Sequence, residues 1–186
     1  CDFGWAQREF VADVERQFNS NKPVRIITLK ARQLGMSTLT EGILFFWNFL
    51  HPGSGQLVIA HKTASTRWLF DKTKLFWRNW DYAPSYELLS DTQHRFAWSN
   101  LSTMQVATAA NVQSGRGMTL SAVHGSEVAF WDDPEELMLG LKQTIPRRPR
   151  TILVLESTAN GVGDYFHKTW TDAEAGQSEF APLFFP

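Results

Sequence analysis

The sequence of 186 residues has the length of one domain, and its formal net charge of −1 comes from 18 Lys and Arg against 19 Asp and Glu. Hydrophobic residues make up 43% and charged residues 20%, a globular composition that excludes a disordered tail or a fibre. The balanced charge excludes a global basic field, so a nucleic-acid partner would need a local basic patch. The single cysteine, Cys1, excludes an internal disulfide.

The ends of the chain and its apolar runs bear on where the protein works. No secretory signal heads the sequence, and the longest apolar run, residues 42–50, is too short to span a bilayer. The chain starts at Cys1 and stops on the apolar stretch Phe184-Phe185-Pro186. We therefore expect a piece of a longer protein in which residues 1–186 form one domain.

Helices and strands are expected to alternate along the chain, because helical spacing and short apolar runs follow one another. The expected elements are a helix over 5–18, a strand over 24–29, a helix over 39–50, a strand over 56–60, a helix over 63–80, an antiparallel hairpin over 94–107, a strand over 120–123, a helix that starts at Asp133 and Pro134, a strand over 151–155 and a helix over 164–175. This order predicts a three-layer α/β fold with a mostly parallel sheet. Helical spacing also places the tryptophans in the core, and the inward set of the third helix is Trp68, Leu69, Leu75, Phe76 and Trp80.

The segment KARQLGMST, residues 30–38, follows a strand and precedes a helix, as a phosphate-binding loop does. Gly35 and Ser37 occupy the second glycine and the hydroxyl position of G-x-x-x-x-G-K-[ST], but Lys30 and Met36 replace its first glycine and its lysine. Backbone amides at the helix start can bind phosphate, and Ser37 can ligate Mg²⁺. Lys30 or Arg32 can supply the missing positive charge. An ordinary strand-to-helix turn is the alternative.

Three further candidates fall at or near the expected strand ends, where ligands of such sheets bind. Glu127, in HGSEVAFW, is suited to activate a water for attack on a γ-phosphate, with Ser126 at the place where an aspartate commonly holds Mg²⁺. The segment ESTANG, residues 156–161, can hydrogen-bond a terminal phosphate. Arg116 lies between two glycines and is suited to be an arginine finger. Taken singly, each pattern is more typical of an ordinary loop residue or a polar turn.

Together, the segments KARQLGMST, SGRGMT, HGSEVAFWDDPEE and ESTANGVGDYFH resemble the large terminase subunit of tailed bacteriophages, and the resemblance covers residues 5–170. It implies an ATP-driven motor that packages viral DNA, with ATP and Mg²⁺ as cofactors. It also implies the additional-strand, RecA-like P-loop fold. The C-terminal nuclease domain of that family has no room here, so DNA cleavage is not expected.

The resemblance assigns roles residue by residue. Glu127 matches the catalytic glutamate, and Arg116 matches an arginine offered to the ATP of a neighbouring subunit. Ser37 would hold Mg²⁺, with Ser126 or Glu127 acting through water. Nucleotide contacts are implied for Gln7, which would read adenine, and for Lys30, Ala31, Arg32, Gln33, Leu34, Gly35, Met36, Ser37 and Thr38. Coupling of hydrolysis to movement, or sensing of the γ-phosphate, is implied for Ser157, Thr158 and Asn160.

The partners that the resemblance implies are double-stranded DNA, the portal protein, the procapsid and the small terminase subunit. The chain would form a ring of identical subunits while packaging in the host bacterial cytoplasm, and it would be a monomer in isolation. Contacts with DNA or with a ring neighbour are candidates for the basic cluster Lys142, Arg147, Arg148 and Arg150, which is otherwise a solvated loop. Two other functions remain open: a helicase-like or DNA-repair ATPase, and a nucleotide-binding module in which Met36 and Ser126 have removed turnover.

Overall fold

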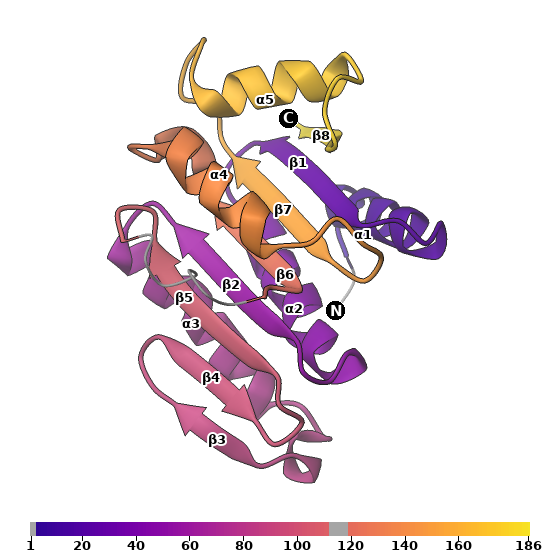
Figure 1. Cartoon of the computed structure of the whole chain (residues 1–186), viewed down its shortest axis with the longest axis vertical. Coiled ribbons are helices and arrows are strands. Elements are labelled where there is room, and N and C mark those ends of the chain that lie inside the picture. The colour runs from indigo at the N-terminus through magenta and orange to yellow at the C-terminus, as the bar shows by residue number, and fades with distance from the viewer. Residues whose placement is uncertain (1–2, 112–118) are drawn as a thin grey trace.

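The computed structural model describes residues 3–111 and 119–186, which form a three-layer α/β domain (Figure 1). The sheet has the order β3-β4-β5-β2-β6-β7-β1-β8. Its elements are α1 (Trp5–Asn19), β1 (Val24–Lys30), α2 (Met36–Leu50), β2 (Gly55–Ala60), α3 (Thr63–Arg78), η1 (Ala83–Ser85), β3 (Leu88–Asp91), β4 (Arg95–Trp98), β5 (Thr103–Thr108), β6 (Ala122–Ser126), η3 (Val128–Phe130), α4 (Pro134–Thr144), β7 (Ile152–Ser157), α5 (Tyr165–Glu174) and β8 (Ala181–Phe185). Within the two described ranges, no helix has the length and apolar character needed to cross a membrane.

Six strands, from β5 to β8 in the sheet order, are parallel, and β4 and β3 continue the sheet antiparallel at one edge. The helices α1, α2 and α3 cover one face and α4 and α5 cover the other (Figure 1). Successive strand residues alternate between the two cores, so Ile26 packs with α2 and α3 while Ile27 packs with α4 and α5. Both faces are therefore apolar, which explains the continuous apolar runs of these strands.

The expected α/β fold and the antiparallel hairpin are confirmed, because β4 and β5 pair antiparallel across residues 99–102. Two short strands were not expected: β3 has four residues, and β8 contains Pro182, which an edge strand tolerates. The expected strand over 120–123 is wrong in its limits, because β6 runs on through His124, Gly125 and Ser126, all of them buried. The polar residues hide the end of this strand in the sequence.

The prediction that Trp68 and Leu75 of α3 are core side chains is also wrong. Trp68 and Leu75 are 50% and 51% exposed. The buried residues of α3 are Thr66, Leu69, Phe70 and Thr73. These four repeat at i, i+3, i+4 and i+7, so the buried stripe lies one position away from the stripe of Trp68 and Leu75. Trp5, at the start of α1, is likewise 55% exposed, although its ring packs against that of Phe185.

Candidate nucleotide-binding site

The loop between β1 and α2 forms one side of the candidate site. β1 ends at Lys30 and α2 begins at Met36, so the turn consists of residues 31–35. Gly35 has a φ of 70°, and a Cβ at this position would lie 2.9 Å from Nε2 of Gln7. Glycine alone meets both conditions without strain. An α-helix leaves its first amides without intrahelical acceptors, and in α2 these belong to Met36, Ser37 and Thr38. The loop thus presents amide donors at the carboxyl edge of the sheet.

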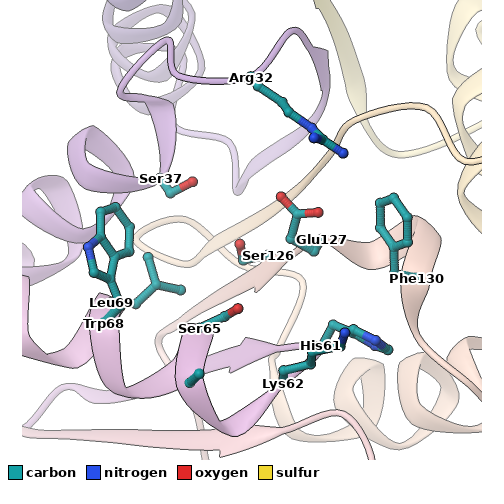
Figure 2. A pocket seen from close by; sticks show the side chains of 11 residues that line it. Arg32, Ser37, His61, Lys62, Ser65, Trp68, Leu69, Ser126, Glu127 and Phe130 are labelled. Atoms are coloured by element: carbon teal, nitrogen blue, oxygen red, sulfur yellow. The ribbon is translucent and has the colours of Figure 1, made fainter.

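A pocket of about 560 Å³ opens beside this loop, a volume suited to a small-molecule ligand (Figure 2). It lies where the chain leaves β1, β2 and β6. Its lining residues are Arg32, Ser37, His61, Lys62, Ala64, Ser65, Trp68, Leu69, Ser126, Glu127 and Phe130. Four residues that the sequence analysis singled out, Arg32, Ser37, Ser126 and Glu127, are therefore brought to one pocket.

Glu127 follows β6 directly and holds an unusual backbone conformation. Its φ of 58° and ψ of 40° are left-handed, although it is not a glycine. Such a conformation costs of order 1–3 kcal/mol and persists only where the surroundings impose it, most often at functional sites. In Figure 2 its carboxylate points into the pocket, on the side of Ser37 and Arg32. The left-handed residue thus presents its carboxylate to the pocket.

The segment after β7 is joined to the turn that follows Glu127. The backbone N–H of Ala129 donates to Oγ of Ser157 at 3.2 Å, and Nδ2 of Asn160 donates to the backbone oxygen of Ala129 at 2.9 Å. The backbone N–H and the backbone C=O of Ala129 are thus both hydrogen-bonded to the segment 157–160. Thr158, between the two, is half-buried. Ser157 and Asn160 therefore contact the neighbourhood of Glu127 and do not line the pocket themselves.

The two candidate cations of the loop have different surroundings. Arg32 is exposed and its guanidinium points into the pocket (Figure 2). Lys30 has a side chain only 8% exposed, and its Nζ lies 3.8 Å from Oε2 of the buried Glu156. The sequence analysis gave Lys30 the phosphate contact first. In the structure Arg32 is the one of the two that lines the pocket.

The remaining loop residues divide between the open side and the core. Met36 is 1% exposed and belongs to the core, and Leu34 packs against it, so their side chains face away from the pocket. The amide of Ala31 donates to the backbone oxygen of Phe185 at 2.7 Å, which couples the loop to β8. Gln33 is exposed and Thr38 is half-buried. For Met36, only the backbone amide is suited to contact a ligand.

Gln7 lies on the α1 side of the loop, outside the residues that line the pocket. Its Oε1 accepts from the backbone N–H of Gly4 at 3.0 Å, and its Nε2 fills the space beside Gly35. The residue is therefore in contact with the loop.

A buried ionic network, which the sequence analysis missed, lies behind the pocket. His124 of β6 lies between two acids: its Nδ1 is 2.6 Å from Oε1 of Glu41 in α2, and its Nε2 is 3.1 Å from Oε1 of Glu156 in β7. All three side chains are almost fully buried. The available signal was a charged or ionisable residue inside each of three otherwise apolar elements, since such groups are seldom buried unless paired.

The charges of this network follow from its contacts. Burial alone would lower the pKa of His124, but hydrogen bonds with Glu156 and Glu41 outweigh it and raise that pKa to about 9. Burial alone would raise the pKa of Glu156, but the hydrogen bond and charge of His124, with the charge of Lys30, lower it to about 2. Burial raises the pKa of Glu41. At neutral pH His124 is therefore a cation and Glu156 an anion.

Oxygen atoms suited to Mg²⁺ lie in the pocket and directly behind it. The hydroxyls of Ser37 and Ser126 and the carboxylate of Glu127 line the pocket, and the buried carboxylate of Glu156 accepts a hydrogen bond from Ser126. Oε2 of Glu156 is buried and has no hydrogen-bond partner among the described residues. The described ranges contain no cluster of three His, Cys, Asp or Glu that would hold a metal by itself. This donor set fits Mg²⁺ that draws most of its ligands from phosphate and water.

The basic cluster lies at the other end of the sheet. Arg147, Arg148 and Arg150 belong to the connection between α4 and β7, which leads into the amino end of β7, whereas the pocket lies at the carboxyl ends of the strands. Arg147 and Lys142 approach Oε1 of Glu179 at 3.1 and 3.6 Å. Arg148 and Arg150 are exposed. Arg116 lies outside the described residues.

No family model matches this sequence, and no curated protein matches it. Solved structures do. The ATPase domain of the large terminase of Thermus phage P74-26 has a TM-score of 0.72 and 18% identity, over 92% of this chain and 79% of that one. The large terminase of bacteriophage HK97 has a TM-score of 0.74 and 12% identity, over 100% of this chain and 39% of that one. The large terminase of another thermophilic bacteriophage, in complex with ATP-gamma-S, has a TM-score of 0.69 and 12% identity, over 98% of this chain and 44% of that one.

The chain therefore has the fold of phage large terminase ATPase domains, a RecA-like P-loop fold, as the resemblance implied. It spans less than half the length of the HK97 protein and of the terminase in complex with ATP-gamma-S.

Proposed function

We propose that this chain is the ATPase domain of a large terminase, and that it hydrolyses ATP to drive double-stranded viral DNA into a procapsid. One observation carries the proposal: Glu127, held in a left-handed conformation at the end of β6, faces Arg32 and Ser37 across one pocket. This is the arrangement that phosphoryl transfer to water requires, namely a base opposite a phosphate cradle. The terminase fold supports the choice of this motor among P-loop ATPases.

In the proposed reaction the chain's own residues position the attacking water and neutralise the charge of the phosphates. The first amides of α2 and the guanidinium of Arg32 bind the phosphates. Glu127 orients a water and accepts its proton as the water oxygen attacks the γ-phosphorus, so that the β–γ bond breaks and ADP leaves with its bridging oxygen. Ser157 and Asn160 hold the turn after Glu127. Catalysis then arises mostly from placement and from charge stabilisation.

When bound, Mg²⁺ would neutralise charge on the β- and γ-phosphates. Ser37 would hold it, with Ser126 or Glu127 acting through water. The remaining partners follow the family: double-stranded DNA, the portal protein, the procapsid, the small terminase subunit and further copies of the chain in a ring. The candidates for contact with DNA or with a neighbour are Arg147, Arg148 and Arg150, which are exposed in the connection before the amino end of β7.

The two loop cations give a first prediction. Arg32→Ala is expected to weaken ATP binding and to cut turnover by at least about tenfold, or about 1.4 kcal/mol, because it removes the positive charge that the loop contributes to the pocket. Lys30→Met keeps the aliphatic stem and removes the charge, and it should lose less ATP affinity than Arg32→Ala. Equilibrium titration with a fluorescent ATP analogue measures both. The opposite order would mean that Lys30 leaves Glu156 and takes the phosphate contact.

The contacts to Ala129 give a second prediction. Ser157→Ala leaves the buried N–H of Ala129 without its acceptor, which costs about 1–3 kcal/mol of stability. Turnover should also fall, because the turn after Glu127 is loosened, while ATP affinity should hold. Urea unfolding and steady-state phosphate release measure the two effects. Asn160→Ala should act in the same direction. Normal turnover in both variants would exclude a role for this segment in positioning Glu127.

Two assays separate this function from the alternatives. A nucleotide-binding module without turnover, favoured by the burial of Met36 and the serine at position 126, would bind ATP without steady-state phosphate release. A helicase-like ATPase would separate the strands of a partial duplex. The proposed motor should release phosphate and leave the duplex intact.

A further inference from the structure

The serine at position 126 leaves a charge missing from the proposed magnesium site. A serine hydroxyl is neutral, whereas the aspartate that commonly stands there contributes a negative charge. β6 and β7 are parallel neighbours, and Ser126 is paired in register with Glu156. Paired residues of adjacent strands point to the same face of a sheet. The carboxylate of Glu156 is thus next to the hydroxyl of Ser126, on the face that α2 covers.

The two oxygens of Glu156 have different surroundings. Oε1 accepts a hydrogen bond from Oγ of Ser126 at 3.1 Å and lies 3.1 Å from Nε2 of His124. Oε2 has no hydrogen-bond partner in the described part of the chain, and Glu156 is 1% exposed. Nζ of Lys30 lies 3.8 Å from Oε2, beyond hydrogen-bond distance. A buried carboxylate oxygen without a hydrogen bond is costly, which favours a ligand at this point.

The first turn of α2 lies beside the same carboxyl group. The hydroxyl of Ser37, the residue expected to hold Mg²⁺, lies near enough to Glu156 to help lower the pKa of its carboxyl group. Ser126, Ser37 and Lys30 thus all lie near this carboxyl group.

We propose that Glu156 supplies, from β7, the carboxylate that the bound metal needs and that Ser126 cannot provide. The inference rests on the proposed function, since it concerns the Mg²⁺ that accompanies the nucleotide. Glu156 would stabilise the ion directly or through a coordinated water, and Ser126 would orient the carboxylate by its hydrogen bond. Lys30 is then the countercharge of Glu156 while the ion is away.

The test measures how much Mg²⁺ contributes to nucleotide binding. The affinity of each variant for a fluorescent, non-hydrolysed ATP analogue is determined in saturating Mg²⁺ and in EDTA. The affinity in Mg²⁺ divided by the affinity in EDTA, here called the magnesium ratio, reports the linkage between metal and nucleotide. Glu156→Gln keeps size and loses charge. It is expected to reduce the ratio at least about tenfold, or about 1.4 kcal/mol, with EDTA affinity unchanged or tighter.

A second variant moves the charge back. In the double variant Ser126→Asp with Glu156→Gln, the carboxylate stands on β6, and the amide of the new glutamine can donate to it. This variant should recover most of the magnesium ratio. A residue that only supports the fold would not be replaced by a carboxylate on the neighbouring strand. Glu41→Gln is the matched control, because Glu41 is the other buried acid bonded to His124 and lies on its far side. Its ratio should stay at the wild-type value.

The outcomes are separable. An unchanged magnesium ratio in Glu156→Gln overturns the inference and leaves the proposed function intact. A wild-type chain that binds no nucleotide overturns both. If Glu156→Gln does not fold, Glu156→Asp keeps the buried charge and withdraws it by one methylene. An intermediate ratio in that variant supports the inference, and an unaltered ratio contradicts it.

Discussion

Replacing Glu127 by Gln is expected to reduce ATP turnover by about 10²- to 10⁴-fold, the usual contribution of a positioned general base. Glutamine keeps the size of the side chain and most of its hydrogen bonding, but it cannot accept the proton of the attacking water. ATP affinity should be retained, because the phosphate cradle is made by the loop and α2. Turnover and nucleotide affinity are measured on one preparation.

Glu87→Gln is a suitable control for this experiment. Glu87 is an exposed carboxylate just before β3, the edge strand that lies four places from β6 in the sheet order. Its variant should hydrolyse ATP at the wild-type rate. If Glu127→Gln lost ATP binding while its unfolding transition stayed normal, Glu127 would be a binding or structural residue and another base would be needed.

The second large effect concerns Arg116 and the proposed ring of subunits. An arginine finger is worth about 10³- to 10⁵-fold in rate. If Arg116 acts on a neighbour's ATP, the isolated domain should be a poor ATPase whose specific activity rises with protein concentration. Arg116→Ala should abolish the rise and keep ATP affinity. Phosphate release across a dilution series measures both.

Mixing two inactive variants tests whether Arg116 acts between chains. Arg116→Ala chains keep a complete loop and base, and Glu127→Gln chains keep the arginine. At an interface between the two, the intact site of an Arg116→Ala chain meets the intact arginine of a Glu127→Gln chain. Where wild-type chains associate and are active, the mixture should regain part of that activity. A mixture that stays inactive means that Arg116 works within its own chain or serves the structure only.

The parts of the fold that the sequence predicted are those where burial repeats with a clear period. The helices and central strands have strong apolar patterns, so their order and the sheet type were predictable. β3 and β8 were not, because an edge strand is short and partly exposed, and β8 carries a proline. β6 was cut short because its last residues are polar and yet buried. The exposure of Trp68 depends on how α3 is rotated about its own axis when it packs on the sheet, and that rotation is set by the packing of the whole domain.

The candidate site shows a similar division. Arg32 and Ser37 follow the end of β1, and Ser126 and Glu127 lie at the end of β6. A parallel sheet brings such positions together. Glu156 could not be assigned to this group from the sequence, since its closeness to Ser126 depends on β6 and β7 being neighbours in register. The pairing of His124 with Glu41 likewise joins residues 83 positions apart.

The position of β7 in the sheet limits how force can pass through this domain. β7 is hydrogen-bonded on both sides, to β1 from Ile152 to Ser157 and to β6 from Ile152 to Glu156. A slip by one residue would turn Glu156 to the opposite face and break both ladders. The strand that leads from the arginine cluster towards the carboxyl edge of the sheet therefore cannot slide along its neighbours, and in the proposed motor the central sheet would be the stationary part. Movement would then come from segments outside the ladders, such as residues 158–164, where Gly161 and Gly163 have φ values of 135° and 92°.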